Sequence, residues 1–166
     1  MIPVVVGISG ASGSALALHT VEELLRRDVP TVVVCSNGAR LVWQDEMGAP
    51  FNNSLAVWRE HPSFTFYPLN DLRAPIASGT YPTRGMVVIP ASMNTVASLA
   101  HGITGNLLLR AADVCLKERR RLVLVPRETP LHSIHLENML TLSKAGAVML
   151  PPEPAFYLHP KGIDDI

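Results

Sequence analysis

The stretch RAADVCLKERRRLVLVPRE, residues Arg110–Glu128, decides the fold of this chain. Its first part is rich in Ala, Leu, Lys, Glu and Arg, contains no Gly or Pro, and predicts a helix. The run Leu122–Val125 is continuously apolar, as in a buried parallel strand. Pro126 cannot donate to a sheet ladder, so the strand should end there. A helix that leads into a buried parallel strand indicates an α/β fold.

Arg127 and Glu128 should therefore lie just beyond the carboxyl end of this strand, at the edge where open parallel sheets bind ligands. On the preceding helix, Arg110 and Lys117 are seven residues apart and fall on nearly one face. The basic run from Lys117 to Arg121 also has a plainer interpretation as a solvated helix end, with cations near the negative end of the helix dipole. We favour that interpretation for the run alone, whereas Arg127 and Glu128 remain candidates for a site.

Composition limits the class of protein. The 166 residues suffice for one domain, and 48% of them are hydrophobic but only 5% aromatic, which suits an aliphatic core of helices packed on a sheet. Fourteen basic and fourteen acidic residues give a formal net charge of zero. Nucleic acid is therefore not an expected partner, whereas assembly into a homo-oligomer is expected of a chain that is both apolar and uncharged overall.

The cysteines and the apolar runs indicate the kind of environment. Cys35 and Cys115 lack CxxC spacing, which implies neither a zinc site nor a disulfide framework. No apolar run approaches the ~18 residues of a membrane span, so we expect a cytoplasmic protein and no membrane partner.

Three expected strands each lead into a short polar turn at the start of a helix. The strand–turn pairs are Ile2–Ile8 with SGASGS at Ser9–Ser14, Thr31–Cys35 with Ser36 and Asn37, and Met86–Pro90 with Ala91–Thr95. Backbone amides at a helix start can bind an anion, and small residues let a phosphate or a flat ring approach. For the first turn alone, ligand binding and a conformational need for Gly are equally good explanations. Three such turns at one sheet edge would form a lined crevice.

The remaining elements follow from the hydrophobic pattern. Residues 48–85 are the least regular part, with Phe64–Tyr67 expected as an edge strand and Leu69–Gly85 as a long loop. Helices are expected at Ala15–Arg27, Ala39–Glu46, Val96–His101, Asn106–Glu118 and Ser133–Lys144, and a last strand at Ala147–Leu150. Residues 151–166 are rich in proline and should form an extended C-terminal arm. The spacing of His132 and His135 is insufficient to indicate a metal site.

Several long strings occur together and in order. They are GISGASG at Gly7–Gly13, APIASGT at Ala74–Thr80, RAADVCLKERRRLVLVPRETPL at Arg110–Leu131, IHLENM at Ile134–Met139 and PPEPAFY at Pro151–Tyr157. Over essentially the whole chain the sequence closely resembles the flavin prenyltransferase family, the UbiX-type flavoproteins long labelled as decarboxylases. The resemblance implies a three-layer, Rossmann-like flavoprotein fold with a mainly parallel sheet, as a single domain over residues 1–166. It also implies that dimethylallyl phosphate alkylates reduced FMN at N5 and C6 without a metal, giving prenylated FMN for a UbiD-type decarboxylase.

The resemblance also assigns roles to individual residues. Those expected to contact FMN are Gly10, Ala11, Ser12, Ser36, Ser92, Met93, Asn94, Thr95 and Arg110. Those expected to hold the prenyl phosphate are Lys117, Arg127 and Tyr157. Those expected to take part in catalysis, including proton handling, are Ser12, Glu46, Lys117 and Glu128. Family members form dodecamers built from trimers with active sites between subunits, which implies a homo-oligomer here.

Two departures from the family pattern leave alternatives open. Many members have Cys-Ser after the third turn's proline and often a Lys two residues after the Ser, whereas this chain has Ala91-Ser92-Met93-Asn94. The string PASMNT instead resembles the PASANT string of Cys-decarboxylating flavoproteins, although their PxMNxxMW clamp is absent from this sequence. An FMN-dependent decarboxylase and a non-catalytic flavin carrier subunit are therefore the alternatives.

The second departure is at the C-terminus. Relatives continue past the position of Ile166 into a helix whose Arg completes the phosphate clamp, so either this chain is truncated or its clamp differs.

The expected topology separates two of the cations. In a right-handed β-α-β crossover the helix runs antiparallel to the strands, so Lys117 should lie toward the amino edge of the sheet and Arg127 beyond its carboxyl edge. At about 3.3 Å per strand residue they would be roughly 15 Å or more apart, too far for one prenyl phosphate to touch both. We therefore expect a neighbouring subunit to supply one of them.

Overall fold

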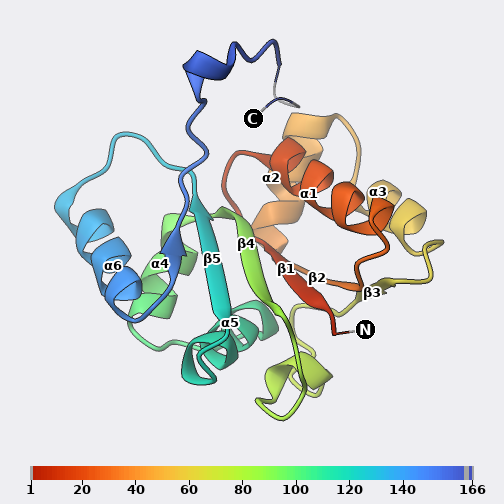
Figure 1. Ribbon diagram of the computed structural model, residues 1–166, viewed down its shortest axis with the longest axis horizontal. Coiled ribbons are helices and arrows are strands. Elements are labelled where there is room, and N and C mark those ends of the chain that lie inside the picture. Colours follow the sequence, from red (N-terminus) through yellow and green to blue (C-terminus); the bar gives the residue numbers. More distant parts are fainter. Residues whose placement is uncertain (1, 163–164, 166) are drawn as a thin grey trace.

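The computed structural model describes residues 2–162 and 165 and has a six-stranded sheet between two layers of helices (Figure 1). The strand order is β3-β2-β1-β4-β5-β6, and every pairing is parallel. The central strand β1 (Val4–Ile8) pairs with β2 (Thr31–Cys35) on one side and with β4 (Gly85–Ala91) on the other. The strand order therefore reverses between β1 and β4, and doubly wound sheets bind ligands at such a switch point.

The outer strands complete the sheet. β5 (Arg121–Pro126) pairs with β4, and the short β6 (Val148–Met149) pairs with β5. At the opposite edge lies β3 (Phe64–Phe66), so the prediction of an edge strand in this segment is confirmed. The α/β class with three layers is confirmed as well, and the sheet of the described residues is parallel throughout rather than mainly parallel.

One helical layer packs on the face that carries Val6, Ile8 and Val33. Its helices are α1 (Ser14–Arg26), α2 (Asn37–Met47) and α3 (Phe51–Trp58). Trp43, Phe51 and Trp58 meet edge to face beneath them, with ring centroids 5.2–5.9 Å apart. This layer therefore holds most of the few aromatic side chains in the core.

The helix α3 is a correction to the sequence-based prediction, which favours irregular structure over residues 48–85. The Asn-Asn-Ser triplet at positions 52–54 consists of weak helix formers. The helix forms because Phe51, Leu55 and Trp58 fall on one face, and all three are buried. Burial of that face overrides the local propensity.

The second helical layer covers the opposite face of the sheet. Its helices are α4 (Met93–Ala100), α5 (Leu107–Lys117) and α6 (Ser133–Lys144). The prediction for α6 has the observed bounds, and those for α4 and α5 differ from them by a few residues. No helix among residues 2–162 and 165 is long and apolar enough to cross a membrane.

A C-terminal segment follows β6 and extends past the carboxyl edge of the sheet (blue in Figure 1). Between residues 151 and 162 its one regular element is a 3-10 turn at Phe156–Leu158. Phe156 and Tyr157 are among the most exposed large side chains of the described chain. Over the described part of this segment, Phe156 and Tyr157 are thus exposed.

Candidate functional site

The turns after β1, β2 and β4 meet at the carboxyl edge of the sheet, which confirms the predicted crevice. Gly10, Ser36 and Ser92, one from each turn, line a common cavity of about 290 Å³. We call this cavity the Ser92 pocket. Its lining residues are Gly10, Ser36, Gly38, Ser92, Asn94, Thr95, Asn106, Leu108 and Leu109.

Three helices begin at the Ser92 pocket, and the capping side chain of each one lines it. Ser36, Ser92 and Asn106 cap α2, α4 and α5, each accepting a hydrogen bond from the backbone amide three residues later, at 3.1, 3.2 and 3.0 Å. The pocket-lining residues in the described chain include no Lys or Arg. Because helix N-termini carry partial positive charge and free amides, this pocket suits an anion such as a phosphate without a cationic side chain.

The first and second turns touch through their glycines. A β-carbon on Gly10 would lie 3.1 Å from the carbonyl carbon of Gly38 and 3.2 Å from its α-carbon. A side chain at Gly10 would therefore force the two backbones apart. The glycine is needed for this close approach, and the same approach leaves backbone open to the pocket.

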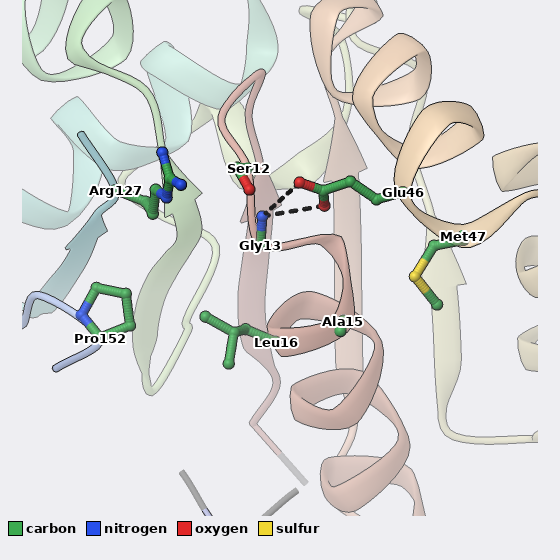
Figure 2. A pocket seen from close by; sticks show the side chains of 8 residues that line it. All are labelled: Ser12, Gly13, Ala15, Leu16, Glu46, Met47, Arg127 and Pro152. Atoms are coloured by element: carbon green, nitrogen blue, oxygen red, sulfur yellow. Dashed lines mark hydrogen bonds between the residues drawn. The ribbon is translucent and has the colours of Figure 1, made fainter. Parts of the chain in front are cut away.

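A second cavity of about 440 Å³ is lined by other residues of the first turn (Figure 2). We call it the Ser12 pocket, and its lining residues are Ser12, Gly13, Ala15, Leu16, Glu46, Met47, Arg127 and Pro152. Apolar side chains come from α1, α2 and the segment after β6, and polar groups come from the first turn, α2 and the end of β5. The cavity therefore combines an apolar wall with one cation and one carboxylate.

The carboxylate of Glu46 is anchored at the N-terminus of α1 (Figure 2). One of its oxygens, Oε2, accepts from the amides of Gly13 at 3.0 Å and Ser14 at 2.7 Å, and Oε1 accepts from Gly13 at 3.2 Å. Partial burial raises the pKa of Glu46, but hydrogen bonds from the Ser12 hydroxyl and from the two amides outweigh it and lower the pKa to about 2. Glu46 is therefore a fixed anion near neutral pH, and it occupies the helix start that a phosphate could otherwise use.

The two residues after β5 have different surroundings. Arg127 lines the Ser12 pocket, and its amide donates to the Ala91 carbonyl of the third turn at 3.3 Å. Glu128 is exposed, and its Oε1 accepts from the amide of Thr129 at 3.0 Å. Both residues lie beyond the carboxyl end of the strand, as predicted, but Arg127 lines the cavity and Glu128 does not.

Tyr157 and Lys117, the other two residues expected at the prenyl phosphate, do not line the Ser12 pocket. Tyr157 is 81% exposed on the C-terminal arm. Lys117 is the last residue of α5 and lies near the amino edge, where β5 starts at Arg121, and its ammonium pairs with Glu118. Lys117 thus lies toward the amino edge and Arg127 beyond the carboxyl end of β5, at opposite edges of the sheet as the topology predicts.

Arg110, expected to contact FMN, is directed toward the long loop between β3 and β4. Its Nη1 pairs with Asp113 at 2.8 Å, and its Nε donates to the Ala77 carbonyl at 3.0 Å. Of the other expected FMN contacts, Ala11 belongs to the first turn, and Met93 packs against the core. None of these three residues lines the Ser92 pocket in the described chain.

The same loop is fastened by Arg120. Its guanidinium donates to the carbonyls of Gly79 at 2.6 Å and Tyr81 at 2.7 Å. The plain interpretation of the basic run as a solvated helix end therefore fits the exposed Arg119 and Arg121 but is wrong for Arg120. Loop anchoring of this kind leaves no trace in the sequence, because the partners are backbone carbonyls.

Sequence reasoning also missed Asn106 and Ser9. Asn106 lines the Ser92 pocket and caps α5. An available signal was an Asn just before the apolar run of Leu107–Leu109, which is an ordinary N-cap pattern. Ser9 is buried between the first and third turns, and no spacing rule distinguishes it from the other serines of SGASGS.

A doubly wound parallel sheet whose switch point carries an N-capped anion pocket defines a nucleotide-binding α/β protein. Among residues 2–162 and 165, no group of three or more His, Cys, Asp or Glu side chains could hold a metal ion.

Comparison with known proteins narrows this class. The Flavoprotein family model matches residues 1–164. A flavin prenyltransferase UbiX from Alkalihalophilus pseudofirmus is 48% identical over 97% of this chain and 83% of its own length. The flavin prenyltransferase LpdB from Lactiplantibacillus plantarum is 49% identical over 98% of this chain and 85% of its own. The chain therefore belongs to the Flavoprotein family and, within it, to the flavin prenyltransferases.

Solved structures agree with this assignment. AnUbiX, crystallised with FMN and dimethylallyl pyrophosphate, superimposes with a TM-score of 0.92 at 42% identity, over 99% of this chain and 85% of its own. A dodecameric FMN-dependent UbiX-like decarboxylase from Escherichia coli O157:H7 has a TM-score of 0.91 at 42% identity, over 99% of this chain and 87% of its own. The FMN-dependent cysteine decarboxylase TvaF is 20% identical with a TM-score of 0.70, so it shares the fold alone.

Proposed function

We propose that this chain binds reduced FMN and joins to it the dimethylallyl group of dimethylallyl phosphate. The observation that carries the proposal is the pair of cavities that the first turn helps to line, one at Gly10 and the other at Ser12 and Gly13. The Ser92 pocket offers three helix N-termini to a phosphate, and the Ser12 pocket offers an apolar wall with Arg127 to an allylic phosphate. The identity to flavin prenyltransferases over nearly the full chain supports the same reaction.

The residues around the Ser92 pocket fit FMN. Gly10, Ser36, Ser92, Asn94 and Thr95 all line it, and the close approach of Gly10 to Gly38 keeps the backbone accessible. The first turn would separate the phosphate from the reacting end of the flavin. When bound, reduced FMN supplies N5 and C6, to which the dimethylallyl carbons become joined as the allylic C–O bond breaks and phosphate leaves.

In the Ser12 pocket, each of three residues would have a distinct task. Arg127 would stabilise the charge of the departing phosphate. The anion of Glu46 would favour positive charge on the allyl group and orient the Ser12 hydroxyl, since Glu46 is held by hydrogen bonds in its charged form. Apolar neighbours such as Leu16 and Met47 would exclude water from an allylic cation.

Glu128 is the better candidate for proton transfer, because Glu46 is too acidic to hold a proton near neutral pH. Joining both positions would release one proton from N5 and one from C6, of which one has to be delivered to the alkene carbon of the dimethylallyl group and the other leaves with the phosphate. Glu128 stands beside Arg127 at the end of β5, exposed and without an ion pair among the described residues. The departing phosphate is a second plausible base.

Lys117 and Tyr157 would act on the Ser12 pocket of a neighbouring subunit. Both side chains are exposed and lie outside the pocket of their own chain. Ile134, Leu136 and Leu140 on α6 are more than half exposed and could pack against other copies. We therefore propose a homo-oligomer, a dodecamer by analogy with the Escherichia coli neighbour, which supplies prenylated FMN to a UbiD-type decarboxylase in the cytoplasm.

Mass spectrometry of the extracted flavin tests the proposal. The protein is incubated anaerobically with reduced FMN and dimethylallyl phosphate, and a parallel sample receives the diphosphate. We expect the flavin to gain the mass of one five-carbon isoprenyl unit and free phosphate to appear in equal amount. Unchanged FMN, with no spectral change, would indicate a carrier subunit, and release of CO2 from an added acid by protein and FMN alone would indicate a decarboxylase.

A further inference from the structure

Ser9 is the residue directly after β1, and it is 1% exposed. Its hydroxyl donates to the carbonyl of Pro90 at 2.9 Å and accepts from the amide of Ser92 at 2.8 Å. Its own amide also donates to the Pro90 carbonyl, at 3.2 Å. A single buried side chain thus ties the first turn to the third.

The bond from the Ser92 amide to the Ser9 hydroxyl completes the N-terminal cap of α4 with a side chain that follows a different strand, β1. In an ordinary capping box, the side chain at the third helical position accepts from the amide of the capping residue. Here that position is Thr95, whose hydroxyl lies 3.0 Å from the Ser92 hydroxyl instead. The Ser92 amide therefore depends on Ser9 for its acceptor.

We propose that Ser9 is a positioning residue for the phosphate of the flavin, an inference that rests on the proposed function. The glycine contact between Gly10 and Gly38 sets the first turn against the second, and Ser9 sets the first against the third. Together these contacts hold the N-termini of α2 and α4 toward one pocket. Ser9 itself does not line the Ser92 pocket, so it would act on a bound phosphate only through Ser92, to which it is hydrogen-bonded, and through its chain neighbour Gly10.

Loss of the Ser9 hydroxyl leaves the Ser92 amide without its acceptor and removes one donor from Pro90. An unsatisfied buried amide is costly, so the third turn would relax away from this arrangement. The phosphate should then bind less well, because amides of α4 would no longer face it. The ring and ribityl chain of the flavin, which do not rely on these amides, should bind as before.

The experiment compares dissociation constants of FMN and riboflavin, which lacks the phosphate, for wild type, Ser9→Ala and Ser9→Cys. For Ser9→Ala we expect the FMN constant to rise roughly 5- to 30-fold while that of riboflavin stays unchanged. For Ser9→Cys, whose thiol fills the same space with weaker hydrogen bonds, we expect the same selective loss in smaller degree, which keeps the test valid if the Ala variant does not fold.

Thr31→Val is the matched control. Thr31 is also 1% exposed, and its hydroxyl donates to the Val29 carbonyl at 2.8 Å, but it lies at the amino edge of the sheet. The Thr31→Val variant should be less stable than wild type, but its preference for FMN over riboflavin should be unchanged. Equal weakening of FMN and riboflavin by the Ser9 variants, or no weakening of FMN, would overturn the role of Ser9. A wild-type chain without preference for FMN would instead contradict the phosphate site of the proposed function, and the inference with it.

Discussion

The two edges of the sheet are built differently. At the carboxyl edge, three turns are tied to one another through Ser9 and through the contact of Gly10 with Gly38, and two cavities open beside them. Toward the amino edge, Lys117 and Arg120 gather around a long loop, away from both cavities. Both cavities are thus lined at the carboxyl edge of one chain, whereas Arg120 at the amino edge anchors the loop and Lys117 lies outside both cavities.

Topology explains this difference. A right-handed crossover between parallel strands places every strand-to-helix turn at the carboxyl edge and the end of every crossover helix toward the amino edge. Lys117 ends α5 and cannot reach the Ser12 pocket of its own chain. If it holds the prenyl phosphate, it must do so in another subunit.

The largest expected effect concerns the chemistry at the carboxyl edge. Glu128→Gln should slow prenylation by roughly 10²–10⁴, the usual range for a lost general acid or base. FMN binding should be intact, because Glu128 does not line the Ser92 pocket. Single-turnover rates with reduced FMN, alongside FMN titrations, measure both quantities. Turnover at the wild-type rate would remove Glu128 from the mechanism.

The next effect concerns the amino edge. Lys117→Ala should slow prenylation by roughly 10²–10³, since one cation on the departing phosphate is lost, while the FMN dissociation constant stays the same. Arg119→Ala is the control, because Arg119 is an exposed cation two residues away. Equal rate losses in both variants would mean that general positive charge matters at this edge rather than Lys117 itself.

A smaller effect separates pocket-lining caps from other caps. Asn106→Ala and His132→Ala each remove a helix N-cap, of α5 and α6 respectively. The loss of the Asn106 cap should lower the free energy of unfolding by about 0.5–2 kcal/mol, and the loss of the longer His132 contact by less. Only Asn106 lines the Ser92 pocket, so only its variant should weaken FMN binding. Urea unfolding and FMN titration together test this. If His132→Ala weakened FMN as much, the three-helix pocket would not be the phosphate site.

The last effect is the dependence of stability on pH, which solvent screening of the exposed Glu46 side chain keeps small. The pKa of Glu46 falls from 4.5 to about 2 on folding, so its anchored carboxylate stabilises the fold above about pH 4.5. This contribution should disappear as the pH falls toward 2, where the folded protein also takes up the proton. Urea unfolding of wild type and Glu46→Gln should therefore differ at neutral pH and converge in acid. A constant difference between the two proteins would mean that the anchoring does not depend on the charge.

Sequence patterns predicted the elements that depend on local periodicity, and they failed where tertiary contacts decide. The buried apolar runs of β1, β2, β4 and β5 and the small polar turns after them are enough to predict a parallel sheet with a crevice at one edge. The helix α3 was not predicted from the sequence, because only the burial of Phe51 and Trp58 overcomes the weak helix propensity of the residues between them. The roles of Ser9 and Arg120 were not predicted either, because their hydrogen-bond partners are backbone groups far away in the sequence.

Complementation between inactive chains tests the central claim, that each active site draws residues from two subunits. Lys117→Ala and Glu128→Gln chains are purified separately, mixed one to one, dissociated and reassembled, and each variant reassembled alone is the control. If Lys117 and Glu128 of one site come from different chains, random assembly should restore about a quarter of the wild-type activity. No activity above the controls, in oligomers shown by analytical ultracentrifugation to contain both chains, would contradict the shared site, as would a fully active monomer.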